Sequence, residues 1–176
     1  MDNYEKTIKV DNIYEGKILS LRVETVEMPD KKYSKREIVD HMKGVGIIAF
    51  DGEDSIYLVR QYRKAVDEFT LEIPAGLVES NEKPIETAKR ELQEETGAGD
   101  FRIEPICVYS VKGKTRVNEN IDDETFGMLF IAGINSFEEL HSEIEKILIS
   151  DKLVENWTYP LIQPILIEEA KKRGFI

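Results

Sequence analysis

The chain has 176 residues, of which 41% are hydrophobic and 34% are charged, and its formal net charge is −11. This length fits one domain with a well-buried core and leaves little room for a second. The acidic balance argues against a nucleic-acid partner. We expect neither a signal peptide nor a membrane contact, because the N-terminus is charged and the apolar runs are short, so the cytoplasm is the expected location.

Short apolar or alternating segments predict strands in the first part of the chain. Leu19, Leu21 and Val23 alternate with polar residues, as in a half-buried strand. Further strands are predicted at residues 43–50, 56–63 and 69–73. A turn that contains Gly52 joins the first two of these, because glycine adopts positive φ without strain.

A helix is predicted next, with Pro84 in its first turn and Gly97 at its C-terminal cap. Strands follow at about residues 101–108 and 125–134, and the first of them predicts a buried Cys107. The Ser-x-x-Glu spacing from Ser136 predicts a short helix. The last predicted elements are a strand at residues 144–149 and a helix at residues 164–173, which Gly174 ends. The order of strands and helices lacks strict βαβ alternation, so it predicts an α+β fold or an α/β sandwich.

Three glutamates of the predicted helix carry the first chemical signal. Glu91, Glu94 and Glu95 are spaced i, i+3 and i+4, so their carboxylates share one helix face. Like charges repel there unless a hard divalent cation such as Mg²⁺ or Mn²⁺ lies among them. For these three residues alone, a solvated acidic face is the competing interpretation.

The wider segment decides between the two interpretations. Residues 76–82 read GLVESNE, and after seven further residues 90–98 read RELQEETGA. Such a pattern arises by chance at on the order of 10⁻⁸ per start site. It resembles the Nudix box, G-x5-E-x7-R-E-U-x-E-E-x-G-U, at every position. The resemblance implies an α+β fold, the Nudix α/β/α sandwich with a mixed sheet, in one domain over residues 1–176.

The same resemblance implies roles for the box residues. Glu91, Glu94 and Glu95, with the backbone carbonyl of Ala75, would hold Mg²⁺ or Mn²⁺. Arg90 would orient the glutamates, and Glu82 would support the loop before the helix. Glu95 and Arg90 are thereby expected to be catalytic. Gly76 and Gly97 are expected to matter for the backbone alone.

Shorter stretches around the box look like the ADP-ribose pyrophosphatase branch of the family. They are Arg36-Glu37, residues 59–63 (VRQYR) and residues 72–76 (EIPAG). In that branch the residue that matches Arg63 lies near the substrate phosphates. The pair that matches Arg36 and Glu37 approaches the adenine across a dimer interface, and Glu72 is also expected to bind substrate.

The branch also implies a reaction and an assembly. Its small-molecule nucleotide, ADP-ribose, would yield AMP and ribose 5-phosphate, with a glutamate outside the box as the general base. Glu143 is the preferred candidate, and Glu145 is the alternative. Strands in residues 1–40 would contribute to a homodimer, since alone they would expose an unpaired sheet edge.

One departure from the branch keeps other functions open. Residues 109–114 (YSVKGK) lack the proline of the branch's turn, and the polar loop predicted from Lys112 to Glu124 is long enough to set specificity. A nucleoside-triphosphate hydrolase of the 8-oxo-dGTP type remains an alternative. A non-catalytic ADP-ribose sensor is another, although the box is intact and the chain has no room for a DNA-binding domain.

Overall fold

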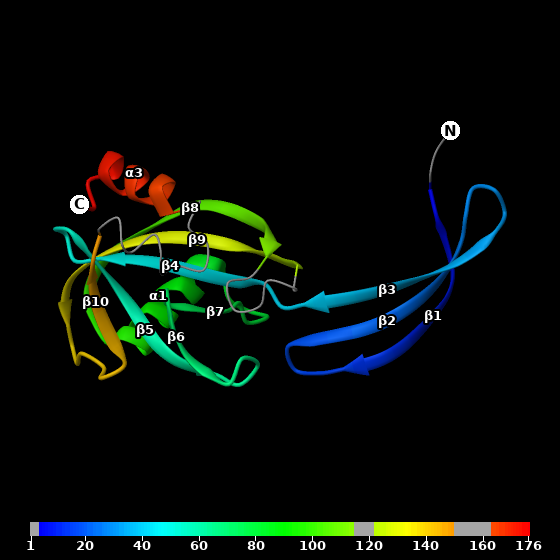
Figure 1. Cartoon of the computed structure of the whole chain (residues 1–176), viewed down its shortest axis with the longest axis horizontal. Coiled ribbons are helices and arrows are strands. Elements are labelled where there is room, and N and C mark those ends of the chain that lie inside the picture. The colour runs from blue at the N-terminus through cyan, green and yellow to red at the C-terminus, as the bar shows by residue number, and fades with distance from the viewer. Residues whose placement is uncertain (1–3, 115–121, 150–162) are drawn as a thin grey trace. The chain divides into compact units, whose positions relative to one another are not determined.

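Two groups of strands emerge in the computed structural model, which describes residues 4–114, 122–149 and 163–176 (Figure 1). Contacts divide the chain into an N-terminal unit, Met1–Lys43, and a C-terminal unit, Gly44–Ile176. The single domain over residues 1–176 stays a prediction. No helix within the described ranges is both long and apolar enough to cross a bilayer.

The N-terminal unit is a three-stranded antiparallel sheet in the order β1-β2-β3. Its strands are β1 (Lys6–Glu15), β2 (Leu19–Glu27) and β3 (Tyr33–His41). This confirms the strand predicted at Leu19–Val23. Leu21 pairs with Val39, which lies 60% exposed. A sheet of this size with exposed apolar side chains has little core of its own.

The C-terminal unit contains a seven-stranded mixed sheet with the order β10-β5-β4-β9-β8. β6 pairs with β5, and β7 pairs with β4. The strands are β4 (Gly44–Phe50), β5 (Ser55–Arg63), β6 (Glu68–Glu72), β7 (Ala75–Leu77), β8 (Ala98–Lys114), β9 (Asp122–Phe137) and β10 (Ile144–Leu148). β4 and β9 run parallel, whereas the other pairings are antiparallel. The strands predicted from apolar runs are therefore confirmed.

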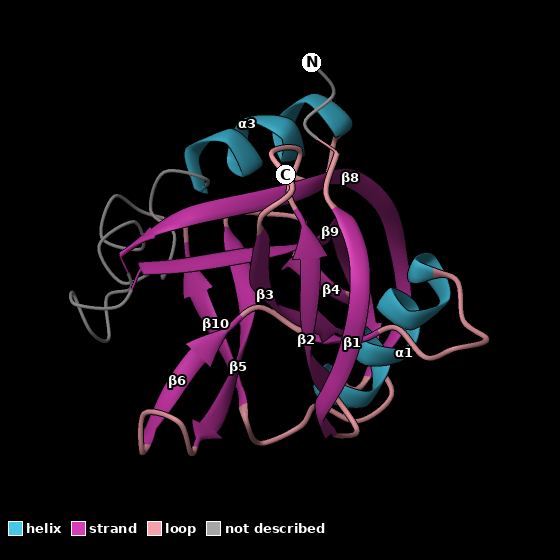
Figure 2. Ribbon diagram, turned by 90° about the vertical axis from the view of Figure 1, so that its right-hand side faces the viewer, coloured by secondary structure: helices cyan, strands magenta, loops and turns pink. Residues whose placement is uncertain are grey.

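Helices α1 (Pro84–Thr96) and α3 (Gln163–Arg173) lie on different sides of this sheet (Figure 2). On the α1 side, Ile47 of β4 belongs to the same buried cluster as Leu92. On the α3 side, the next residue, Ile48, clusters with Leu166. Because both faces of β4 are covered, its sequence is continuously apolar rather than alternating. Fully burying one such side chain stabilises the fold by about 1.5–3 kcal/mol.

The ends of α1 follow from local sequence. Pro84 occupies the first turn, where a missing N–H costs nothing, and the Glu86 carboxylate accepts the Lys83 N–H at 2.8 Å. Gly97 ends the helix at φ +75°, and a Cβ there would lie 1.6 Å from the Glu139 carbonyl oxygen. Glycine is required for both reasons, so the predicted start and end of this helix are confirmed.

Three details differ from the predictions. The short helix expected from Ser136 is wrong, because β9 continues to Phe137 and Ser136 pairs with Asp100 of β8. Strand pairing satisfies the backbone groups that a helix start would leave open. The long loop is also shorter than predicted, since Lys112 pairs with Glu124. Residues 115–121 lie outside the described part of the chain.

Cys107 is in a strand, as predicted, but it is exposed rather than buried. The register of β8 against β9 shifts between Pro105 and Cys107. Ile106 packs against the cluster beneath α3, whereas the next two residues, Cys107 and Val108, are exposed. A bulge of this kind redirects the side chains that follow it.

Candidate functional site

Strand β7 and the C-terminal half of α1 bring the box residues together. β7 pairs with β4 through Ala75 and Gly46, and the Pro74 carbonyl accepts the Ile47 N–H at 2.8 Å. α1 packs on the same face of the sheet through Ala88 and Leu92, which are both fully buried. The box glutamates therefore face a backbone segment that the sheet holds in place.

Arg90 is the charged centre of the box. Its guanidinium makes a bidentate pair with Glu82, at 2.8 Å and 2.9 Å. Its remaining nitrogen, Nη1, donates to Glu91 at 2.7 Å and to Glu94 at 3.0 Å. One cation thus neutralises part of the charge of three carboxylates, which are otherwise mutually repulsive.

Glu82 has a second partner in the buried residue Thr87, whose hydroxyl donates to it at 2.8 Å. Arg90 and then Thr87 lower the pKa of Glu82 to about 2. The pKa of Arg90 is raised in return, chiefly by Glu82. Glu82 therefore ties the loop before the helix to Thr87 and Arg90 of α1.

Gly76 leaves the space that Glu91 occupies. A Cβ built on Gly76 would lie 2.0 Å from both Cδ and Oε1 of the Glu91 carboxylate. No side chain fits at that distance, so the glycine allows the carboxylate to lie against the backbone of β7. The side chain of Glu91 is only 14% exposed as a result.

Glu95 has different partners from the other two box glutamates. Its Oε1 accepts a hydrogen bond from Gln61 Nε2 at 2.5 Å, and its Oε2 accepts the Ala75 N–H at 3.0 Å. Burial raises the pKa of Glu95, Glu91 adds to this rise, and the two hydrogen bonds oppose it. Glu95 is thus a half-buried carboxylate held by neutral donors.

The donor set fits a hard divalent cation. Carboxylate oxygens and backbone carbonyls are the groups that Mg²⁺ and Mn²⁺ prefer. Glu91 fills the hollow over Gly76, and Glu95 is fixed beside Ala75. Glu94 is 59% exposed and tied to Arg90. Within the described ranges, another acidic group brings its carboxylates closer together than Glu91, Glu94 and Glu95 do. It consists of Asp51, Glu53 and Asp54.

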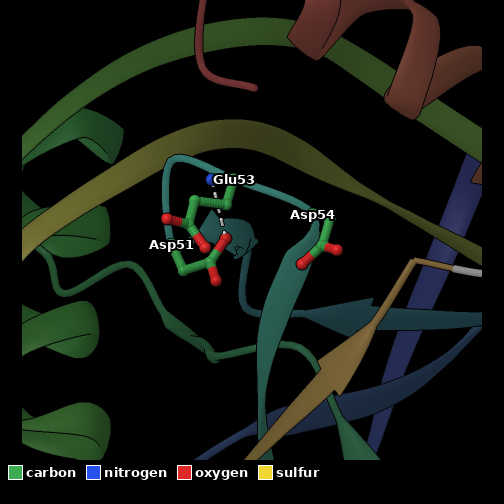
Figure 3. A group of neighbouring side chains, drawn as sticks. All are labelled: Asp51, Glu53 and Asp54. Carbon is green, nitrogen blue, oxygen red and sulfur yellow. Dashed lines mark hydrogen bonds between the residues drawn. The ribbon is translucent and has the colours of Figure 1, made fainter.

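That other group lies in the turn between β4 and β5 (Figure 3). The Asp51 Oδ1 accepts the N–H groups of Glu53 and Ser55, at 2.9 Å and 3.1 Å. Its other oxygen pairs with Lys146 of β10 at 2.7 Å. Burial alone would raise the pKa of Asp51, but Lys146 and the N–H groups bring it below its ordinary value. Because Lys146 already supplies the positive charge, we interpret this acidic group as part of a turn that anchors β10.

Two of the predicted substrate residues meet beside the box. The Arg63 guanidinium pairs with Glu72, with nitrogen-to-oxygen distances of 2.9 Å and 2.5 Å, and the Thr70 hydroxyl donates to the same carboxylate at 2.6 Å. Arg63 lowers the pKa of Glu72, and Glu72 raises that of Arg63. Glu95 contributes to the rise at Arg63, which indicates that the pair lies near the box glutamates.

The other two, Arg36 and Glu37, are neighbours on β3 in the N-terminal unit. Arg36 is paired with Glu5 at 3.0 Å and 2.5 Å and donates to Ser34 at 2.8 Å. Glu5 raises the pKa of Arg36. Glu37 is exposed and pairs in register with Val23. Their predicted role at the adenine stays a prediction.

Glu143 lies in the turn before β10, where its side chain is exposed and its carbonyl accepts the Arg60 N–H at 2.8 Å. Glu145 pairs with Leu58, which belongs to the cluster beneath α3. That face of β5 is opposite to the face of Gln61, since side chains alternate along a strand. Within the described ranges, neither glutamate is hydrogen-bonded or ion-paired to the box.

Sequence reasoning missed Gln61 and Thr87 as parts of this site. Gln61 stands in the VRQYR stretch, two residues before Arg63, so strand alternation puts both on one face. That spacing was the available signal. Thr87 gave no such signal, because its contact with Glu82, five residues earlier, follows no regular helix or strand spacing.

Comparison with known proteins bears on this arrangement. Residues 40–161 match the NUDIX domain family. The methanol dehydrogenase activator of Bacillus methanolicus is 34% identical, over 96% of both chains. The ADP-ribose pyrophosphatase of Bacillus subtilis (strain 168) is 50% identical over 105 residues, which cover 60% of this chain and 57% of that protein. That of Mycobacterium tuberculosis is 40% identical over 64% of this chain and 61% of its own length.

A solved structure of an ADP compounds hydrolase matches the fold with a TM-score of 0.72. The match covers 98% of this chain and 97% of that one, at 16% sequence identity. At this identity the likeness concerns the fold alone. It confirms the expected fold, a mixed sheet with helices on both sides.

The Glu82–Arg90 pair predicts a specific dependence of stability on pH. The carboxyl pKa is about 2 in the folded protein and about 4.3 in an unfolded chain. Its contribution should be complete above pH about 4.3 and should vanish as the pH falls towards 2. Urea unfolding should therefore show that Glu82→Gln destabilises the protein at pH 6 and that the difference shrinks across this window. The matched control Glu79→Gln, in the same loop, should show no such convergence; a pH-independent difference for Glu82→Gln would contradict the assignment.

Proposed function

Because the chain belongs to the Nudix family and is a Nudix pyrophosphohydrolase, we propose that it cleaves ADP-ribose to AMP and ribose 5-phosphate in a metal-dependent reaction. The observation that carries the proposal is the box itself. Arg90 holds Glu82, Glu91 and Glu94 together beside the Gly76 backbone. The 50% identity to an ADP-ribose pyrophosphatase supports the choice of substrate.

Glu91, Glu94, Glu95 and the carbonyl of Ala75 would hold Mg²⁺ or Mn²⁺. Such an ion neutralises diphosphate charge and stabilises negative charge that develops at the reacting phosphorus. The protein's own contribution begins with Arg90, which offsets the repulsion among these glutamates. Gly76 and Gln61 then fix where Glu91 and Glu95 lie.

Arg63 is proposed to bind the phosphates. Its guanidinium is already oriented by Glu72, and a planar guanidinium matches phosphate oxygens with two parallel hydrogen bonds. When substrate binds, Arg63 would give up part of its pairing with Glu72 and bind the phosphates instead. Two phosphates can be balanced by few arginines, which suits a chain with a net charge of −11. Arg36 and Glu37 are proposed to approach the adenine from a partner subunit.

The proposed reaction is an in-line attack of water on one phosphorus. The water oxygen forms a bond to phosphorus as the bridging P–O bond breaks, which separates AMP from ribose 5-phosphate. Glu143 is proposed to accept the proton of this water. Its position in an exposed turn would let it approach a bound substrate, and such movements of loops are common in enzymes.

A second candidate function comes from the full-length likeness. The methanol dehydrogenase activator matches over 96% of both chains, whereas the two bacterial pyrophosphatases match over 60% and 64% of this chain. The chain would in that case also stimulate a dehydrogenase. Addition of the purified protein to a methanol dehydrogenase assay, with Glu94→Gln as the control, would test whether stimulation occurs and needs the box.

The substrate assignment predicts a kinetic preference. With Mg²⁺ present, kcat/KM for ADP-ribose should exceed that for 8-oxo-dGTP, and excess EDTA should abolish both activities. A tenfold preference for 8-oxo-dGTP, about 1.4 kcal/mol in transition-state binding, would transfer the assignment to the triphosphate alternative. Full activity in EDTA would overturn the metal assignment. Binding of ADP-ribose without turnover would favour the sensor alternative.

The assignment of the base predicts different effects for two neighbouring glutamates. Glu143→Gln should lower kcat by on the order of 10²-fold or more, because the water loses its proton acceptor. Mn²⁺ affinity should stay close to that of the unaltered protein. Glu145→Gln is the matched control and should remain active. If Glu145→Gln is inactive and Glu143→Gln has normal activity, the general base is Glu145 and not Glu143.

We propose a homodimer that uses the N-terminal unit. Several of its apolar side chains are exposed, among them Ile13 at 59%, Tyr33 at 66% and Val39 at 60%. Apolar surface of this kind is stabilised by a partner. Sedimentation should give a dimer, and Val39→Glu should weaken it, whereas Val108→Glu in the other unit should not. A mass near the 20.3 kDa monomer at micromolar concentration would contradict the proposal.

A further inference from the structure

Glu95 lacks the cation that its two neighbours share. In the described part of the chain, Arg90 contacts Glu91 and Glu94, whereas the Glu95 oxygens accept hydrogen bonds from Gln61 and from the backbone of Ala75. Glu95 is nevertheless partly buried and is repelled by Glu91. Its orientation therefore depends on two neutral donors.

β5 sets the position of Gln61. Gln61 pairs in register with Thr70 of β6, and the Thr70 hydroxyl donates to the Gln61 carbonyl at 3.2 Å. Four residues earlier on the same strand, Tyr57 packs against the cluster beneath α1. Because side chains alternate, Gln61 points to the same face, towards the C-terminal part of the helix. Its amide nitrogen reaches Glu95 Oε1 at 2.5 Å.

The two donors constrain the carboxylate in complementary ways. Gln61 binds one oxygen and Ala75 binds the other, so rotation about the last side-chain bond would break at least one hydrogen bond. Each carboxylate oxygen can still accept a second partner, because it offers more than one lone pair. The two neutral donors hold the carboxylate without an ion pair, although nearby Arg63 also lowers its pKa.

We infer that Gln61 is a positioning residue, which acts through Glu95 by holding that carboxylate ready to bind a divalent cation. The inference rests on the proposed function, in which Glu95 is a metal ligand. Gln61 itself is not assigned to metal or substrate. Groups that orient a metal ligand in this way affect metal affinity or activity by about 10- to 100-fold when they are replaced.

The test measures binding of Mn²⁺ alone, from the electron paramagnetic resonance signal of the free ion. Gln61→Met keeps the length of the side chain and removes the donor. We expect it to weaken Mn²⁺ binding by about 10-fold or more. Tyr62→Met is the matched control, because Tyr62 is the next residue on β5, faces the other side and is 48% exposed. It should bind Mn²⁺ like the unaltered protein.

A double-mutant cycle tests whether Gln61 acts through Glu95. On a Glu95→Gln background, Gln61→Met should cause no further loss of Mn²⁺ affinity, since the carboxylate ligand that Gln61 positions is no longer present. A second full loss on that background would contradict the inference. Gln61→Asn, which keeps an amide but is shorter by one methylene, should resemble Gln61→Met, and it provides the test if the methionine variant does not fold.

The remaining outcomes separate this inference from the proposed function. Unchanged Mn²⁺ affinity in both Gln61 variants would overturn the role of Gln61 and leave the metal site standing. Equal losses in Gln61→Met and Tyr62→Met would also overturn it, because the strand rather than the amide would be responsible. An unaltered protein that binds no Mn²⁺ would overturn the metal assignment itself, and the inference with it.

Discussion

The crowding of negative charge on α1 is the constraint on which the site depends. Glu91 and Glu94 come together on a helix whose loop adds Glu82, and Arg90 contacts all three. The bidentate pair with Glu82 fixes the guanidinium, and its remaining nitrogen is then directed to the other two. An exposed arginine without that anchor would lose side-chain entropy on pairing and contribute little. The anchor therefore makes the rest of the network effective.

This charge network also dictates backbone features around it. Glu91 can lie against β7 only because Gly76 has no side chain, and α1 can end against the segment after β9 only because Gly97 has none. These two glycines serve different purposes. Gly97 has positive φ and meets a backbone carbonyl, whereas Gly76 makes room for a functional carboxylate. Gly97 caps the C-terminal end of α1, whereas Gly76 lies on β7 and faces Glu91 of that helix.

The sequence predicted what depends on local pattern. The extent of α1 followed from Pro84, Gly97 and helical periodicity, and β4 followed from its continuous apolar run. The partners of Glu95 were not predictable, because Gln61 is 34 residues away and its contact depends on how α1 packs on the sheet. The helix predicted from Ser136 was wrong for a related reason, since the pairing of Ser136 with the distant strand β8 overrode the local capping signal. Local chemistry indicates which groups belong to the site, and tertiary packing decides what each one contacts.

The three box glutamates are consequently not equivalent. Glu91 and Glu94 are held by an arginine of their own helix, so those contacts move with α1. Glu95 is held by β5 and β7, so its position depends on how the helix is seated on the sheet. Leu92, fully buried between these glutamates, sets that seating. Because close-packed cores transmit small displacements, the packing beneath α1 helps to determine where the glutamates on its charged face lie.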